Sequence, residues 1–88
     1  MSNLAKFIHV RVISHSKIEY DSNATMVVLP GVDGELAMLA DHVPITVSLK
    51  SGKVVIHTKE LISEVEITGG VATMNSHNLL DILIVPDK

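Results

Sequence analysis

The stretch Val43–Leu49 reads Val-Pro-Ile-Thr-Val-Ser-Leu, with an aliphatic residue at every second position. Successive side chains of an extended chain point to opposite sides, so the four aliphatic residues share one face. The residues between them share the other face. This period of two predicts a half-buried β-strand.

The same pattern continues on the C-terminal side of this stretch. Lys50-Ser51-Gly52 predicts a turn, and Val54 and Ile56 then alternate with mostly polar neighbours. After a second turn near Thr58–Glu60, the segment Ser63–Ile67 alternates again. Both segments are typical of half-buried strands.

Short apolar segments separated by Gly, Pro, Asn, Asp and Ser fill the rest of the chain, which predicts strands joined by tight turns. We expect a hairpin around Ser22-Asn23 and a turn at Asn75–Asn78. The remaining expected strands are Phe7–Ile13, Lys17–Asp21, Thr25–Leu29, Glu35–Leu39, Val71–Met74 and Leu79–Val85.

Length and composition set the fold class. The chain has 88 residues, enough for a single domain over residues 1–88. Apolar residues make up 47% and aromatic residues only 2%, so the core must consist of aliphatic side chains, many of them β-branched. No window of useful length has a helical period. We therefore predict an all-β fold, a flattened antiparallel β-sandwich of roughly eight to ten short strands.

Charge and residue content argue against several functions. The net charge is −3 and the seven basic residues are scattered, which argues against nucleic-acid binding and direct binding to anionic lipid. Without cysteine, neither disulfides nor thiol chemistry are available. Met1–Lys6 has no signal-peptide character, and no apolar run is long enough for direct membrane insertion.

One segment carries more information than the others: Leu29–Leu36, Leu-Pro-Gly-Val-Asp-Gly-Glu-Leu, followed by Leu39–Pro44. Pro30 lacks an amide donor and is expected to end the strand before it. Gly31 and Gly34 permit backbone shapes that other residues resist. Composition alone favours an ordinary hairpin loop, because the acidic spacing fits no calcium loop and no phosphate-loop lysine follows.

The same segment resembles the signature of ATP synthase epsilon subunits. In that family a strand leads into Pro-Gly-x-Asp/Glu-Gly-Glu-Gly-Ile-Leu-Pro-Gly-His-Ala-Pro-Leu. Leu49–Val54 resembles the family's Leu-Lys-Pro-Gly-x-Val, and Ile67–Val71 resembles its Val-Ser-Gly-Gly-Phe. Asn78–Val85 resembles its closing strand, so the resemblance runs from about Phe7 to Val85.

The resemblance implies a non-catalytic part of the rotor in a proton-translocating ATP synthase. The family's N-terminal sandwich packs against the gamma subunit and touches the c-ring, which couples proton flow to ATP synthesis. The family's c-ring contact loop corresponds to Val32, Asp33, Gly34 and Glu35. His42 and Pro44 correspond to a possible rotor interface. The implied location is peripheral, at the cytoplasmic face of a bacterial inner membrane.

This sequence departs from the family pattern at several positions. Asp41 stands where the family has glycine; aspartate tolerates a left-handed turn, so the loop is expected to keep its shape. Ala40 and Ala37 replace the family's Pro and Gly, and Ser14-His15-Ser16 replaces Thr-Pro-Glu. The family usually continues into a C-terminal helical hairpin, whereas this chain stops at Lys88. We therefore expect it to lack the inhibition and ATP binding that the hairpin provides in some members.

Other functions are less well supported by the sequence. The five histidines show no His-x-His pair with a nearby Glu, so we expect no metal site, catalytic centre, cofactor or small-molecule substrate. No Gly-x-Ser-x-Gly elbow positions a hydrolase nucleophile. The five histidines are His9, His15, His42, His57 and His77.

A free-standing β-sandwich that binds other proteins is the alternative that composition and strand pattern leave open.

Overall fold

The computed structural model describes residues 7–15, 17–41 and 43–85, and within these ranges the chain forms nine strands and no helix. The prediction of an all-β fold with eight to ten strands is confirmed. The strands are β1 (Ile8–Ser14), β2 (Lys17–Ala24), β3 (Met26–Gly31), β4 (Gly34–Leu39), β5 (Ile45–Leu49), β6 (Gly52–His57), β7 (Ile62–Ile67), β8 (Gly70–Met74) and β9 (Leu79–Ile84).

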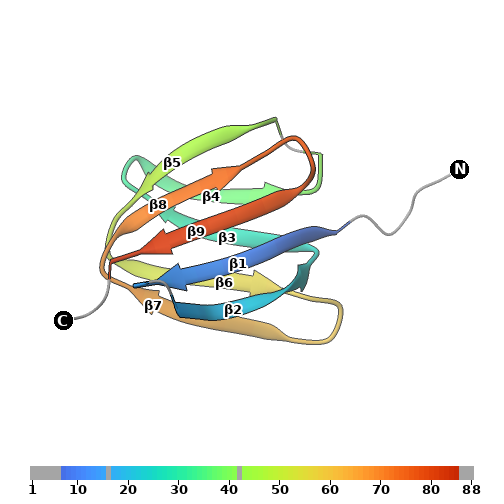
Figure 1. The fold of residues 1–88 in the computed structure, drawn as a ribbon, viewed down its shortest axis with the longest axis horizontal. Helices are drawn as coiled ribbons and strands as arrows, with labels where there is room; N and C mark the ends of the chain where they lie inside the picture. The colour runs from blue at the N-terminus through green and yellow to red at the C-terminus, as the bar shows by residue number, and fades with distance from the viewer. Residues whose placement is uncertain (1–6, 16, 42, 86–88) are drawn as a thin grey trace, which may run out of the picture.

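The strands form two layers that face each other (Figure 1). One layer has the strand order β2-β1-β9-β8-β5, and the other has the order β4-β3-β6-β7. A single residue pair, Gly31 of β3 with Leu49 of β5, continues the ladder from one layer to the other. All pairings are antiparallel except that of β1 with β9, which is parallel.

Alternate residues of both layers point inward and form one aliphatic core. Val10 and Val12 of β1 and Leu80 and Ile82 of β9 have no exposed surface, for example. In the stretch that predicts the fold, Leu49 is buried. The buried apolar residues are Ile8, Val10, Val12, Ala24, Val27, Leu29, Met38, Leu49, Val54, Ile56, Ile67, Ala72, Met74, Leu80 and Ile82.

The predicted hairpin around Ser22-Asn23 is wrong. These residues lie inside β2, which continues to Ala24 and pairs with β1 instead of β3. Because β2 is an exposed edge strand, it accommodates polar residues that usually mark turns. Thr25 alone separates β2 from β3, and its backbone N–H donates to the His57 carbonyl of the other layer at 2.8 Å.

Pro30 does not end the strand before it either. β3 continues through Pro30 to Gly31, and the Pro30 carbonyl accepts a hydrogen bond from the Lys50 backbone N–H at 2.9 Å. Proline has no backbone N–H to donate, so Pro30 takes part in backbone pairing through its carbonyl oxygen.

Over the described residues, the structure contains no helix with the length and apolar character needed to cross a membrane.

Candidate interaction site

The segment Gly31–Glu35 forms the tight connection between β3 and β4. Gly31 and Gly34 are the last paired residues of the two strands, and only Val32 and Asp33 lie between them. The connection therefore projects two non-glycine side chains at the end of the sandwich. The sequence predicted a turn-rich loop here, and the structure confirms it.

The two glycines determine the shape of this connection. Gly34 has a φ of 130°, a backbone conformation that side chains bearing a Cβ rarely adopt. A Cβ on Gly31 would lie 2.7 Å from the Gly34 carbonyl oxygen, closer than such atoms approach. Only glycine fits both positions without a change in the backbone.

Backbone hydrogen bonds hold the connection against β5. The Val32 N–H donates to the Ser48 carbonyl at 3.0 Å, and the Lys50 N–H donates to the Pro30 carbonyl at 2.9 Å. These bonds flank the Gly31–Leu49 pair that joins the two layers. The loop is thus held by backbone hydrogen bonds to both layers.

The exposed surface of the loop combines an apolar and an acidic residue at its tip, Val32 and Asp33, with a second acidic residue, Glu35, at the start of β4. Val32 is 53% exposed, and Asp33 and Glu35 are also exposed. None of the ion pairs within the described residues involves either carboxylate. An open groove of about 500 Å³ lies between this loop and β5, with Ile45 and Val47 in its lining. The arrangement suits a partner that presents a basic side chain beside an apolar one.

Of the other two residues expected at a rotor interface, the structure describes only Pro44. His42 lies outside the described residues. Pro44 is exposed in the connection between β4 and β5. β4 runs from the loop to the opposite end of the sandwich, because Gly34 pairs with Gly31 and Leu39 pairs with Met26. The six residues of β4 span roughly 20 Å, and this length separates Pro44 from the loop. The structure therefore does not bring the two predicted contact regions together.

Asp41 lies in the same connection and adopts a left-handed conformation, with a φ of 67°. Its backbone N–H donates to the side-chain oxygen of Asn78 at 2.7 Å. The expectation that aspartate would replace the family's glycine at a left-handed turn is confirmed.

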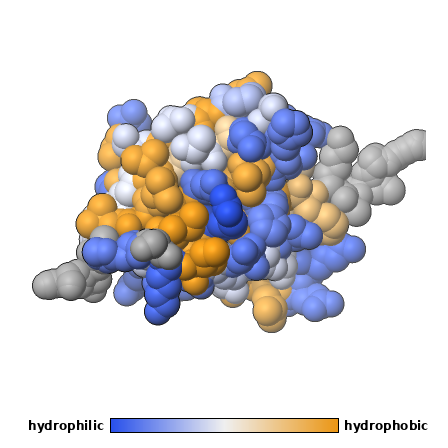
Figure 2. Space-filling model, viewed as in Figure 1, coloured by the Kyte–Doolittle hydropathy of each residue, from blue (hydrophilic) through white to orange (hydrophobic). Residues whose placement is uncertain are grey.

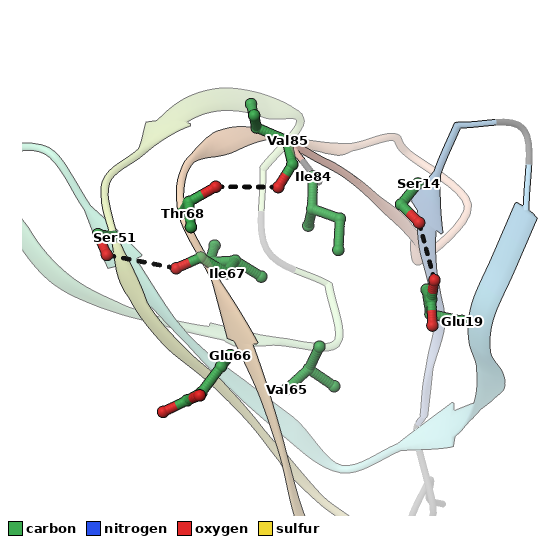
Figure 3. A pocket seen from close by; sticks show the side chains of 9 residues that line it. All are labelled: Ser14, Glu19, Ser51, Val65, Glu66, Ile67, Thr68, Ile84 and Val85. Carbon is green, nitrogen blue, oxygen red and sulfur yellow. Dashed lines mark hydrogen bonds between the residues drawn. The ribbon is translucent and has the colours of Figure 1, made fainter. Parts of the chain in front are cut away.

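A second groove, of about 410 Å³, lies at the open side of the sandwich between β2 and β7 (Figure 3). Val65 and Ile67 of β7 and Ile84 of β9 supply its apolar wall. Glu19 lies on the β2 side and accepts a hydrogen bond from the Ser14 hydroxyl at 2.8 Å.

The outer face of the layer β2-β1-β9-β8-β5 carries a line of apolar side chains that the sequence did not predict. Val71 of β8 pairs with Leu83 of β9, Leu83 with Ile13 of β1, and Ile13 with Ile18 of β2. Paired residues share a face, so these four side chains form one line across four strands, hereafter the apolar row. Leu83 is 53%, Ile18 52% and Val71 38% exposed.

No group of three or more His, Asp or Glu side chains suited to a metal ion occurs in the described ranges. His9 contacts two polar side chains of the neighbouring strand β2. One ring nitrogen lies 2.5 Å from an Asp21 carboxylate oxygen, and the other lies 3.1 Å from the Asn23 side-chain oxygen. All three side chains are exposed and tie β1 to the edge strand β2.

Comparison with known proteins identifies the family. Residues 7–84 match the family described as the β-sandwich domain of the ATP synthase delta/epsilon chain. The match includes every strand and the Gly31–Glu35 loop. The chain belongs to the ATP synthase delta/epsilon family.

Sequence relatives are bacterial ATP synthase epsilon chains. The protein from Rickettsia prowazekii is 37% identical over 73 residues, covering 80% of this chain and 65% of the relative. That from Lactobacillus johnsonii is 38% identical over 74 residues, covering 80% and 51%. The chain thus spans about half to two thirds of the length of these relatives. The protein from Rickettsia bellii is 30% identical over 92 residues, covering 90% of this chain and 85% of the relative.

Solved structures of the same fold come from mitochondrial ATP synthases. A chain of the Euglena gracilis OSCP/F1/c-ring assembly superposes with a TM-score of 0.86 at 20% identity, covering 97% of this chain and 54% of that one. A chain of the Tetrahymena thermophila central stalk/c-ring assembly gives a TM-score of 0.75 at 16% identity, covering 90% and 63%. At these identities the likeness concerns the fold.

Proposed function

We propose that this protein is a non-catalytic subunit of the central stalk in a proton-translocating ATP synthase. In this role it links the gamma subunit to the c-ring and couples proton flow to ATP synthesis. The observation that carries the proposal is the family match over residues 7–84, which includes all nine strands. Its location would be the cytoplasmic face of a bacterial inner membrane, where it is held by its partners.

The c-ring contact in this proposal is the loop Val32, Asp33, Gly34 and Glu35. Its backbone has a shape that requires glycine at positions 31 and 34, and hydrogen bonds to β5 hold that shape in place. A rigid contact loses less conformational entropy on binding and transmits torque without first deforming. The exposed carboxylates of Asp33 and Glu35 favour a partner surface that carries basic groups.

Pro44 and His42 belong to a second proposed contact with the rotor. Because Pro44 lies at the opposite end of the sandwich from the loop, the two contacts would engage different partner surfaces. A subunit that bridges gamma and the c-ring needs two separate surfaces of this kind.

Charge reversal at the loop tests the proposed coupling. We expect Glu35→Lys to reduce ATP-driven proton pumping in native membrane vesicles, since the reversed charge disturbs complementarity at the c-ring. The matched control is Glu60→Lys, which reverses an exposed charge in the turn between β6 and β7, at the other end of the sandwich. Pumping equal to wild type in the Glu35→Lys enzyme would exclude the loop as a coupling contact.

A further inference from the structure

The groove between β2 and β7 lies beside a sheet edge. Among the described strands β7 pairs only with β6, and its other side is hereafter the open edge. Val65 and Ile67 of β7 and Ile84 of β9 form the apolar part of the groove. Figure 2 shows hydrophobic surface gathered in the left half of the view, the side where β7 and β9 end in Figure 1. Apolar surface thus lies next to the open edge.

The backbone of β7 determines what can bind at the open edge. In the turn before β7, the Thr58 N–H donates to the Leu61 carbonyl at 2.9 Å, so these residues are a hydrogen-bonded pair. Such pairs alternate along an antiparallel ladder, so Glu64 and Glu66 turn their backbone N–H and C=O groups away from β6, to the open edge. A row of such groups is the template for a further strand, so the occupant that fits is an extended segment.

The two strands beside the groove differ in how well they can accept a further strand. β7 pairs with β6 in an uninterrupted register from Ile62 to Ile67. The pairing of β2 shifts its register between Val12 and Ile13 of β1, and such irregularities protect a sheet edge against further pairing. A regular strand is therefore added at β7.

The charges of β7 argue against a second copy of this chain as the added strand. Two β7 strands paired antiparallel about Val65 would place Glu64 of each opposite Glu66 of the other. Pairing about either glutamate would place that residue opposite itself. Like charges directly opposite each other destabilise a sheet, so β7 does not favour self-pairing.

The same charges favour a basic strand. Glu19 and Glu66 line the groove, both are exposed, and none of the described lining residues is basic. The ion pairs between described residues leave these two carboxylates out, whereas Glu64 is held by Lys53 at 3.3 Å. A lysine or arginine opposite Glu66 would form an opposite-charge pair, and its neighbours along the strand would face the groove.

We propose that the open edge of β7 binds an extended segment of another protein in which lysine or arginine alternates with aliphatic residues. The segment pairs antiparallel with β7 and extends the layer β4-β3-β6-β7 by one strand. Its aliphatic side chains lie in the groove beside Val65 and Ile67, and its basic side chains lie on the outer face with Glu64 and Glu66. The inference does not depend on the proposed function, so either can fail alone.

The test is a titration of a fluorescent probe peptide, Lys-Val-Lys-Val-Lys-Val-Lys, with this chain at low salt, followed by fluorescence anisotropy. Glu66→Lys is expected to weaken binding about fivefold or more, because it sets like charges opposite each other. The matched control is Glu60→Lys, the same charge change in the turn before β7 and outside the groove, which should bind like wild type. Absence of wild-type binding, or equal affinity of the two variants, would overturn the inference.

N-methylated probes distinguish strand pairing from charge attraction. Residues opposite Glu64 and Glu66 share their face, so the lysines of the probe turn their backbone N–H groups to β7 and the valines turn theirs away. Methylation of the lysine backbone nitrogens should therefore abolish binding, whereas methylation of the valine backbone nitrogens should leave it unchanged. Equal effects of the two, or the reverse order, would exclude antiparallel strand addition.

Circular dichroism and thermal melting would recognise a folding defect of Glu66→Lys, which places two lysines opposite each other because Lys53 pairs with Glu66. In that case Glu66→Gln replaces it, since glutamine removes the charge and should weaken binding about twofold. Binding of this variant equal to wild type would overturn the inference. Sedimentation of the chain alone should show a monomer, and a dimer that the probe dissociates would assign the open edge to a second copy instead.

Discussion

Arg11 on β1 and Asp81 on β9 form a two-point ion pair, with Nε to Oδ1 and Nη2 to Oδ2 both at 2.9 Å. The residues are 70 positions apart and lie opposite each other in the parallel pairing. This contact joins the first strand to the last at the centre of one layer. The Asp81 hydrogen bond, followed by its negative charge, raises the pKa of Arg11 above its ordinary value.

The geometry of this pair predicts that lysine cannot replace arginine. Arg11→Lys keeps the charge but loses the planar fork that makes both bonds, so its melting temperature should fall below that of wild type. Arg11→Met should fall at least as far, because Asp81 then keeps a charge without a partner. The decreases should be small, since both side chains are about a third exposed and water screens the pair. A melting temperature of Arg11→Lys equal to wild type would show that a single charge contact is sufficient.

Leu80 and Leu83, both on β9, provide a test of the strand register. Leu80 is fully buried, so Leu80→Ala should lower the free energy of unfolding by about 2–5 kcal/mol. Leu83 faces outward, so Leu83→Ala should change it by no more than about 0.5 kcal/mol. Urea unfolding of the two variants measures both values. Similar losses in the two would mean that β9 does not present opposite faces to core and solvent.

Gly34 provides a test of the loop backbone. At a φ of 130°, a β-branched side chain is strained, so Gly34→Val should destabilise the domain by roughly 1–3 kcal/mol. No atom lies within 4 Å of the position that a Cβ would take, so the effect would come from the backbone and not from crowding. The control is Val32→Ala in the same loop. Because Val32 is exposed, this variant should melt at the wild-type temperature. Thermal melting of Gly34→Val at the wild-type temperature would mean that the loop backbone adapts.

Much of the fold follows from local sequence. The alternation in Gly52–His57 and Ile62–Ile67 predicts which residues are buried, because one face of each strand meets the core. The turn at Asn75–Asn78 is also confirmed, and the Asn75 side chain accepts hydrogen bonds from the His77 and Leu79 amides there. Turn residues and period-two patterns are short-range signals, so a sequence alone displays them.

The errors arise where distant strands decide the structure. Ser22-Asn23 has the composition of a turn, yet pairing with Val10 and His9 draws it into β2. The parallel pairing of β1 with β9 has no local signal, so the apolar row could not be predicted either. A hint exists in β1, where Ile13 is apolar although it follows the inward-facing Val12. Its meaning depends on Leu83, which only the folded chain brings alongside.

The central claim, that this chain is a stalk subunit, is tested most directly by purification from native membranes. The chain is tagged at one end, the membranes are solubilised in a mild detergent, and the proteins that co-purify are quantified by mass spectrometry. The account predicts that gamma and c-ring subunits are recovered with the wild-type chain, and that an equally tagged unrelated β-sandwich recovers neither. Recovery of this chain without gamma and without the c-ring would contradict the account and favour a free-standing binding module.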